Sequence, residues 1–289
     1  MQNALSIDVE EHFQVHAFET LTNRSEWDNY PSRVVANTER ILRLLAKYQV
    51  RATFFILGWV AERHPELVCA IADGGHEVAT HGYWHELIYR QSPESFGEDL
   101  RRSLEVIQKA LAGRSVTTPV QIEGYRAPAF SITKQSLWAL DVLHEQGIRY
   151  DSSIFPLVAH DRYGISDASR FANRLKNGMW EFPVSTVVIG KRNLPVAGGG
   201  YFRLYPLWLT RKAIKSINRE GQPAVIYLHP WEFDPEQPRM NKAPLLSRFR
   251  HYVNLQRTEQ RLEKLLQEFE FAPMNQAFRC YFEDAKVIV

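Results

Sequence analysis

Short apolar runs alternate with longer segments of helical periodicity along most of the chain, and this order constrains the fold more than any other feature. A strand pattern at 5–9 precedes helical spacing at 37–48. The same alternation continues through strand patterns at 52–57, 77–80, 121–125, 148–150, 180–184 and 224–228, and through helical patterns at 60–72, 93–111, 134–145 and 207–218. Strands that alternate with helices at this spacing predict βα units around a parallel sheet.

The chain has 289 residues, which suits one large α/β barrel with a small appendage. The character of the sequence changes after residue 233, where three prolines precede a charged, arginine-rich helical pattern at 245–269. We therefore expect a barrel over residues 1–233 and a C-terminal extension over 234–289 that packs on it.

Charge and cysteine content exclude several classes of protein. The 35 basic residues nearly balance the 33 acidic ones, so nothing in the overall charge indicates a partner such as nucleic acid or a membrane surface. Cys69 and Cys280 lie far apart, and we expect two reduced thiols, with Cys69 buried in an apolar helix. The sequence shows neither a signal peptide nor a transmembrane segment, so we expect a cytoplasmic location. The oligomeric state is not indicated.

Two carboxylates stand at the end of the first expected strand. Asp8 and Glu10 are two residues apart and so share one face of a continuing strand, whereas Glu11 falls on the other face. Such a pair can divide labour, because one carboxylate can bind a cation while the other acts as a base. A solvated acidic strand end would carry the same residues, and Glu11 is a rival ligand if the strand ends early.

Two histidines follow the expected strand at 77–80. His81 and His85 stand at positions i and i+4, which converge on one face if the segment makes a helical turn, and two converging imidazoles are metal-ligand geometry. This spacing also arises by chance in proteins without a metal. His76 precedes the same strand and therefore lies at the opposite end, where we expect a structural role.

Two further polar residues follow strands. Arg126 stands in a loop stiffened by Pro128, so its guanidinium can be held in place to pair with a carboxylate, although a surface arginine in a turn is the simpler alternative. His229 ends the last strong strand and is a candidate general acid, although a lone histidine there is more often structural.

Taken in order, these clusters resemble the motifs of the NodB-homology polysaccharide deacetylases, carbohydrate esterase family 4. The family carries Asp-Asp, His-Ser/Thr-x-x-His, Arg-x-Pro, an Asp-containing segment and Leu-x-His, which here correspond to 8–10, 81–85, 126–128, Asp151 and 227–229. The chain departs from the pattern where Val9 separates the two acids, where Gly82 replaces Ser or Thr, and where Phe155 replaces a usual Trp. The run at 231–235 is similar to a narrower branch, the deacetylases of exosortase-linked exopolysaccharide loci.

The resemblance implies an α/β fold, a distorted (β/α)7 barrel, and removal of an N-acetyl or O-acetyl group from a saccharide substrate in exopolysaccharide biosynthesis. It places a divalent cation, zinc with cobalt or nickel as substitutes, on Glu10, His81 and His85. It makes Asp8 the base and His229 the acid. Arg126 would hold Asp8 ionised, Asp151 would orient His229, and a backbone N–H near Tyr125 would stabilise the oxyanion.

Aromatic residues near the motifs favour a sugar substrate, because pyranose faces stack on rings. The expected substrate-binding residues are Tyr125, Phe130, Trp84, Phe155 and Trp231. The glycine-rich run at 198–202 either lines the sugar groove or is a plain flexible loop. Two other functions are compatible with the same residues: another amide hydrolase on this scaffold, such as an allantoinase-like enzyme, and a catalytically degenerate sugar-binding module.

Overall fold

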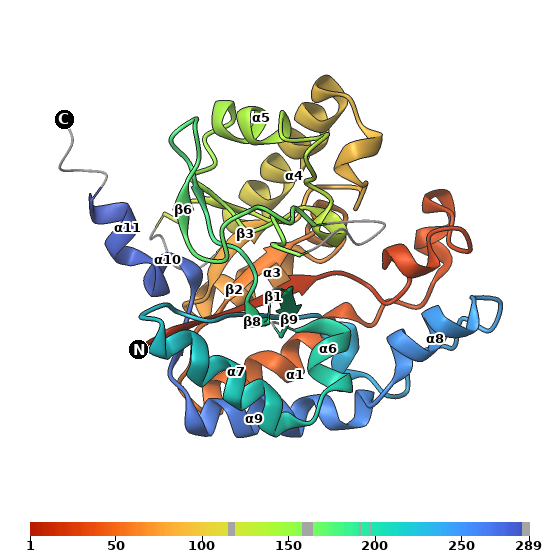
Figure 1. The fold of residues 1–289 in the computed structure, drawn as a ribbon. Coiled ribbons are helices and arrows are strands. Elements are labelled where there is room, and N and C mark those ends of the chain that lie inside the picture. Colours follow the sequence, from red (N-terminus) through yellow and green to blue (C-terminus); the bar gives the residue numbers. More distant parts are fainter. Residues whose placement is uncertain (115–118, 158–163, 191, 197, 285–289) are drawn as a thin grey trace.

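A parallel β-sheet that curls into a distorted barrel forms the centre of the molecule, with helices packed around its outside (Figure 1). The computed structural model describes residues 1–114, 119–157, 164–190, 192–196 and 198–284. The expected α/β barrel is confirmed. None of the helices in the described ranges combines the length and apolar composition that crossing a bilayer requires.

The strands of the central sheet follow the order β10-β1-β2-β3-β4-β5-β7-β6, and β11 also pairs with β1. Pairing among these strands is parallel except between β6 and β7. Their bounds are β1 Asn3–Val9, β2 Thr53–Ile56, β3 Glu77–Thr80, β4 Gly124–Tyr125, β5 Tyr150–Asp151, β6 Asn173–Arg174, β7 Trp180–Glu181, β10 Val225–Leu228 and β11 Phe271–Ala272. A separate hairpin consists of β8 Thr186–Ile189 and β9 Arg192–Pro195.

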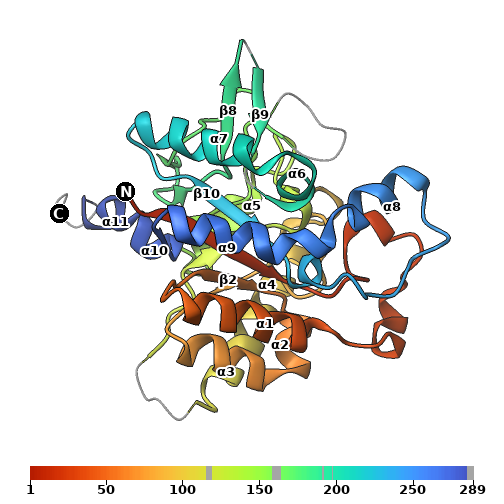
Figure 2. The ribbon, with the colours of Figure 1, turned by 90° about the horizontal axis from the view of Figure 1, so that it is seen from below.

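Helices cover the outer face of the sheet. Seen from below, α9 lies between α1 and α7 (Figure 2), and buried side chains of these three helices belong to one hydrophobic core. The bounds of the helices are α1 Val34–Lys47, α2 Gly58–Arg63, α3 Pro65–Asp73, α4 Pro93–Leu111, α5 Ala139–Glu145, α6 Gly199–Leu204, α7 Leu207–Arg219, α8 Leu245–Tyr252, α9 Thr258–Glu268, α10 Met274–Ala277 and α11 Arg279–Asp284.

Alternation along β1 turns apolar side chains toward the outer helices and two polar side chains toward the inside of the barrel. Leu5 and Ile7 are fully buried in the core shared with the outer helices. Ser6 and Asp8 point the other way, where the guanidinium of Arg126 donates a hydrogen bond to each of them at 2.7 Å. A strand exposes successive side chains to opposite faces, so one short strand both packs the shell and lines the site.

Backbone contacts close the barrel between β7 and β10. The Ser185 N–H donates to the Val225 carbonyl at 3.3 Å, and Gly198 forms a parallel bridge with Tyr227. A Cβ at Gly198 would lie 1.8 Å from the Tyr227 carbonyl oxygen, so only glycine allows the two backbones this close. The glycine run thus closes the barrel, a role that its sequence alone did not reveal.

Several expected elements have different bounds in the structure. The helix expected at 60–72 is two helices, because Pro65 has no N–H to continue the first and instead begins the second. The helix expected at 245–269 is interrupted at Asn254, whose φ of 54° is left-handed. The strand expected at 121–125 is only β4, and the helix expected at 134–145 begins at residue 139.

The segment after residue 233 contacts the rest of the chain at several places. β11 pairs in parallel with the start of β1, and Leu262 of α9 is fully buried in the main core. The division of the chain at residue 233 stays a prediction, and residues 285–289 lie outside the described part. Both cysteines are free, but Cys69 is half-buried rather than buried, and Cys280 is exposed.

Candidate metal centre and acid–base site

A cavity of about 180 Å³ lies where the carboxyl ends of β1, β3, β4 and β10 meet. It brings together chemistry-bearing residues from both halves of the chain, as expected at this end of a parallel α/β barrel. Its lining residues are Asp8, Glu10, Val15, His16, His81, His85, Ala127, Ala129, Phe130, Tyr227, His229 and Trp231.

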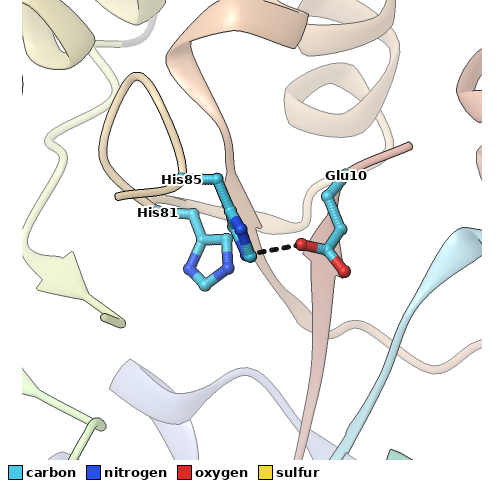
Figure 3. Close-up of side chains that lie close together, drawn as sticks. All are labelled: Glu10, His81 and His85. Atoms are coloured by element: carbon cyan, nitrogen blue, oxygen red, sulfur yellow. Dashed lines mark ion pairs between the residues drawn. The ribbon is translucent and has the colours of Figure 1, made fainter. Parts of the chain in front are cut away.

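Glu10, His81 and His85 form a cluster with metal-binding geometry (Figure 3). One ligand atom from each lies within 4.8 Å of the others, and Glu10 Oε2 is 2.7 Å from His85 Nε2. Burial alone would raise the pKa of Glu10, but the charge and hydrogen bond of His85, with the charges of His229 and His81, lower it to about 2. Glu10 is therefore ionised at neutral pH, as a carboxylate ligand must be.

The ring of His81 is prepared to donate a lone pair. Its Nδ1 lies 2.7 Å from the Arg126 carbonyl oxygen, which accepts a hydrogen bond and leaves Nε2 unprotonated in the neutral ring. Burial is the main influence on the pKa of His81 and lowers it to about 4. Two imidazoles and one carboxylate are a donor set that suits zinc, so the residues present fit a divalent cation.

The two histidines converge through a loop, not through the helical turn expected from their spacing. Gly82 has a φ of 75° and His85 a φ of 54°, so the backbone is left-handed at both residues and does not form a helical turn. Asp99 of α4 fixes this loop, because its carboxylate accepts hydrogen bonds from the N–H groups of Tyr83 at 2.7 Å and Trp84 at 3.0 Å. The i and i+4 spacing predicted that the two histidines converge, but the contacts with α4 determine the loop conformation that brings them together.

Glu11 has a different function from Glu10. Its carboxylate turns away and accepts hydrogen bonds from the N–H groups of Arg33 and Val34 at the start of α1, and from the hydroxyl of Ser32. The first N–H groups of a helix have no partner within it, so this carboxylate caps α1. Glu10 instead accepts a hydrogen bond at Oε1 from Trp231 Nε1 at 3.0 Å, which orients it into the cavity.

Asp8 is held by a fully buried arginine. Arg126 donates to Asp8 Oδ1 at 2.7 Å, and its other nitrogens donate to the carbonyl and hydroxyl of Ser152. The guanidinium carbon also lies 4.2 Å from the centre of the Phe55 ring. These contacts fix the position of Arg126, so its guanidinium holds the side chain of Asp8 in place beside the metal cluster.

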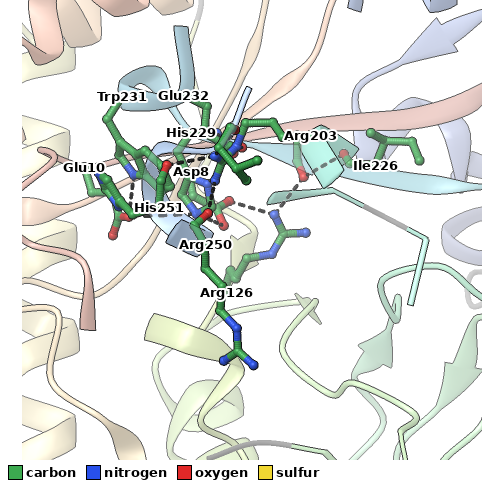
Figure 4. A network of polar contacts seen from close by, with 12 residues as sticks. Asp8, Glu10, Arg126, Arg203, Ile226, His229, Trp231, Glu232, Arg250 and His251 are labelled. Carbon is green, nitrogen blue, oxygen red and sulfur yellow. Dashed lines mark hydrogen bonds and ion pairs between the residues drawn. The ribbon is translucent and has the colours of Figure 1, made fainter. Parts of the chain in front are cut away.

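His229 faces Asp8 and Glu10 across the cavity (Figure 4). Its Nε2 lies 3.9 Å from Asp8 Oδ2 and 3.8 Å from Glu10 Oε1. Its Nδ1 lies 2.8 Å from Glu232 Oε1, and this oxygen also accepts the His229 N–H at 3.0 Å. Burial alone would lower the pKa of His229, but Glu232, Glu10 and Asp8 together raise it to about 9.

Glu232 holds the position that the sequence assigned to Asp151. The 3-10 turn Pro230–Phe233 folds Glu232 back over His229, whereas Asp151 accepts hydrogen bonds from the N–H and hydroxyl of Ser153. Burial raises the pKa of Asp151. The expectation that Asp151 orients His229 is therefore corrected. A carboxylate three residues after a strand-end histidine was visible in the sequence, but only the turn makes it a partner.

A buried arginine completes this arrangement. Arg203 of α6 donates from Nε to Glu232 Oε2 at 2.6 Å, and from its other nitrogens to the carbonyls of Arg250, His251 and Val253. Burial alone would raise the pKa of Glu232, but Arg203 and His229 lower it. The orientation of His229 thus depends on α6 and on the end of α8, a link that no local pattern indicated.

The expected aromatic residues divide into two groups. Phe130 and Trp231 line the cavity, whereas Tyr125 and Phe155 are buried in the core and Trp84 lines a separate surface depression. All five residues are aromatic, and the sequence does not distinguish those that line the cavity from those that do not. The burial of each side chain depends on neighbours that are distant in the chain. His76, as expected, is structural: its Nδ1 accepts the Ala52 N–H at 3.1 Å.

A second, larger cavity of about 380 Å³ adjoins the first and shares Tyr227, His229 and Trp231 with it. Gly199, Gly200 and Tyr201 line it, so part of the glycine run faces a groove as well as closing the barrel. The opposite wall comes from residues 247–253 at the end of α8. The catalytic cavity therefore opens onto a groove built partly from the C-terminal region.

Comparison with known proteins identifies two family regions. Residues 25–150 match the model for polysaccharide deacetylases. Residues 152–279 match a domain of unknown function, DUF3473. The boundary between them falls at β5, inside the central sheet, so the two regions together form one barrel.

Two relatives and a solved structure agree with the match to the polysaccharide deacetylase model. The chain is 34% identical over 115 residues to a peptidoglycan deacetylase of Helicobacter pylori, covering 40% of this chain and 36% of the relative. It is 37% identical over 73 residues to a chitooligosaccharide deacetylase of Rhizobium leguminosarum bv. trifolii, covering 25% and 34%. The chain thus spans about a third of these relatives.

A Mycobacterium smegmatis protein proposed to be a polysaccharide deacetylase has a similar fold, with a TM-score of 0.64 and 19% identity over 99% of this chain and 91% of that one. The matched region and the relatives agree, and the solved structure shows that the fold is shared. Residues 25–150 of this chain are therefore similar to the polysaccharide deacetylases.

Proposed function

We propose that this protein is a metal-dependent hydrolase that removes acetyl groups, chiefly N-acetyl groups, from an oligosaccharide or polysaccharide. The observation that carries the proposal is the convergence in one cavity of the Glu10, His81 and His85 cluster with Asp8 on one side and His229 on the other. Amide hydrolysis needs these three elements: an electrophilic centre, a base for water and an acid for the leaving amine.

Glu10, His81 and His85 would hold the cation, and zinc fits this donor set, with cobalt or nickel as substitutes. When bound, the metal supplies Lewis-acid polarisation of the acetyl carbonyl and acidifies water. Three protein ligands leave positions for water and substrate, as a catalytic site requires.

The residues of the chain move the protons. Asp8 accepts a proton from the attacking water, and Arg126 holds its carboxylate in place. His229, on the opposite side, donates a proton to the sugar nitrogen as the carbon–nitrogen bond breaks. The products are acetate and a free amine.

We place the oxyanion donor further along the loop than the sequence indicated. The two N–H groups that follow Tyr125 are engaged, since Arg126 donates to the Thr80 carbonyl and Ala127 to the Ser153 hydroxyl. Ala129 lines both cavities with a φ of 50°. We assign the donor to its N–H, with Phe130 and Trp231 against the sugar.

Acetate release tests this function. The purified protein, loaded with zinc, should release acetate from acetylated chitooligosaccharides or peptidoglycan fragments and leave free amines, and a chelator should abolish release until zinc is restored. An allantoinase-like enzyme would release no acetate from any sugar. A degenerate binding module would bind the sugars without hydrolysis and would need no cation, and either result would contradict the proposal.

Glu232 is a positioning residue for His229, and we expect its amide variant to lose turnover. Glu232→Gln should lower kcat roughly ten- to hundredfold with little change in KM, because outer partners orient a reacting group without touching substrate. Glu232→Asp should recover part of the loss. Steady-state kinetics of Asp151→Asn provide the comparison: a kcat loss in that variant together with normal turnover of Glu232→Gln would return the role to Asp151.

The natural substrate is proposed on the resemblance of the 8–10 and 231–235 runs to deacetylases of exopolysaccharide loci. We place the enzyme in exopolysaccharide biosynthesis on that ground, acting on an N-acetylated amino sugar, the chemistry shared by the substrates in the relatives' names. The cytoplasmic location expected from the sequence stays a prediction.

A further inference from the structure

The first turns of α8 present large apolar side chains to solvent. Leu245 is 80% exposed, Leu246 60% and Phe249 56%. Residues three and four positions apart on a helix are neighbours, so Phe249 lies beside both Leu246 and Leu245, and the three form one apolar surface, the α8 face. Single exposed apolar residues are ordinary, but a group of them beside a functional cavity marks an interaction site.

The segment that carries the α8 face is rich in basic residues. The segment 238–250 contains Arg239, Lys242, Arg248 and Arg250 and has no aspartate or glutamate. Arg239, Lys242 and Arg250 are exposed. The whole chain has a net charge of only +2, so its near balance conceals a local excess of positive charge at this site.

The opposite side of α8 is firmly attached to the body of the protein. His251 is buried and stacks on Trp231 with ring centres 4.2 Å apart, and it also packs against Phe18 at 4.6 Å. Arg203 donates hydrogen bonds to the carbonyls that end the helix. The α8 face is therefore held outward at the edge of the molecule (Figures 1 and 2) and is not a loose segment.

The α8 face stands at the entrance of the catalytic groove. Phe249 belongs to the face and also lines the larger cavity, together with Arg250 and Leu204, which is 47% exposed. This cavity shares His229 and Trp231 with the catalytic cavity. Whatever occupies the α8 face lies directly beside the path of substrate to the metal cluster.

We propose that the α8 face docks on an anionic lipid bilayer. Apolar side chains next to basic ones, without acidic residues between them, match the interfacial region of such a membrane, where leucine and phenylalanine enter the acyl boundary and basic groups meet lipid phosphates. A protein partner of equal charge complementarity would need an acidic surface that also carries an apolar patch. Docking in this orientation turns the groove toward the membrane, so the enzyme acts on an acetylated saccharide attached to a lipid; this last step rests on the proposed deacetylase function.

Vesicle flotation of the full chain tests docking without any measurement of activity. The protein should float with vesicles that contain phosphatidylglycerol, bind vesicles of pure phosphatidylcholine much more weakly, and dissociate as salt is added. Lys242→Gln/Arg239→Gln should weaken binding by about 25-fold, since each basic residue near an anionic surface contributes roughly a fivefold factor. Leu245→Ser/Leu246→Ser/Phe249→Ser should weaken it by at least about tenfold.

The β8–β9 hairpin provides a matched control. Val188 and Ile189 are 51% and 58% exposed, so Val188→Ser/Ile189→Ser removes apolar surface elsewhere and should bind as the wild type does. Failure of the wild type to float, or unchanged binding of the α8 variants, would overturn the proposal. So would a wild-type dimer, seen by light scattering, that the triple serine variant converts to monomer, because the face would then pair two copies. Acetate release is independent of this assay, so either proposal can fail alone.

Discussion

His81→Ala/His85→Ala should bind no stoichiometric divalent cation, and acetate release should fall to background. The two imidazoles supply two of the three ligand atoms of the cluster, and a lone Glu10 carboxylate has little affinity for zinc at neutral pH. Elemental analysis of the wild type and of the double variant, both purified after zinc loading, provides the measurement. Equal metal content in the two proteins would place the cation elsewhere and contradict the site.

Glu10→Gln and Glu11→Gln form a matched pair for the same question. Glu10→Gln should lose metal affinity while the fold is retained, because its carboxylate faces the cluster. Glu11→Gln should keep the metal but lose about 1 kcal/mol of unfolding free energy, since it weakens the cap on the N-terminus of α1. Zinc titration and thermal unfolding of both variants separate the two roles. A variant pair with the reverse pattern would make Glu11 the ligand.

Asp8→Asn should retain the metal and lower kcat by about 10²–10⁴-fold, the range that a general base contributes. The asparagine keeps the shape of the side chain and an oxygen for Arg126, so the loss reflects the proton acceptor and not the collapse of the site. Metal content and melting temperature should therefore stay near the wild-type values. His229→Ala should show a loss of similar size with the metal retained, because it removes the proton donor on the other side of the cavity.

Asp28→Asn, at an exposed acid that pairs with Arg63 on the surface, is the control for a general effect of removing negative charge. It should release acetate at the wild-type rate. Near-normal turnover by Asp8→Asn would show that another group accepts the proton from water. Glu11 would then be tested next, although its hydrogen bonds to the start of α1 leave it turned away from the cavity.

The sequence by itself determined the architecture and the end of the sheet at which the site lies. Strand and helix periodicity depend on neighbours one to four positions away, so the alternation of elements was readable, and β3 Glu77–Thr80 and α4 Pro93–Leu111 have the expected bounds. The parallel order then places the carboxyl ends of the parallel strands at one rim. Asp8 and Glu10 stand at the end of β1, and His81, Arg126 and His229 each follow another strand, which is sufficient to predict that they meet.

Tertiary packing alone decided which of these residues pair with each other. Glu10 and Glu11 are adjacent in the sequence. The N–H groups at the start of α1 donate hydrogen bonds to the Glu11 carboxylate, whereas the Glu10 carboxylate faces the cavity. Glu232 rather than Asp151 orients His229, because a 3-10 turn returns it to the histidine and Arg203 holds it there from 29 residues away. Contacts of this kind join segments that are distant in sequence, and no local period encodes them.

The exposure of α8 was also beyond the sequence, although its composition was visible. The helical pattern at 245–269 is expected to belong to an extension that packs on the barrel. In the structure, His251 and the carbonyl groups that end the helix make that attachment, and Leu245 and Leu246 remain in solvent. A helical pattern fixes which side chains share a face, but only the shape of the neighbouring surface determines which face is buried, because burial depends on the whole fold.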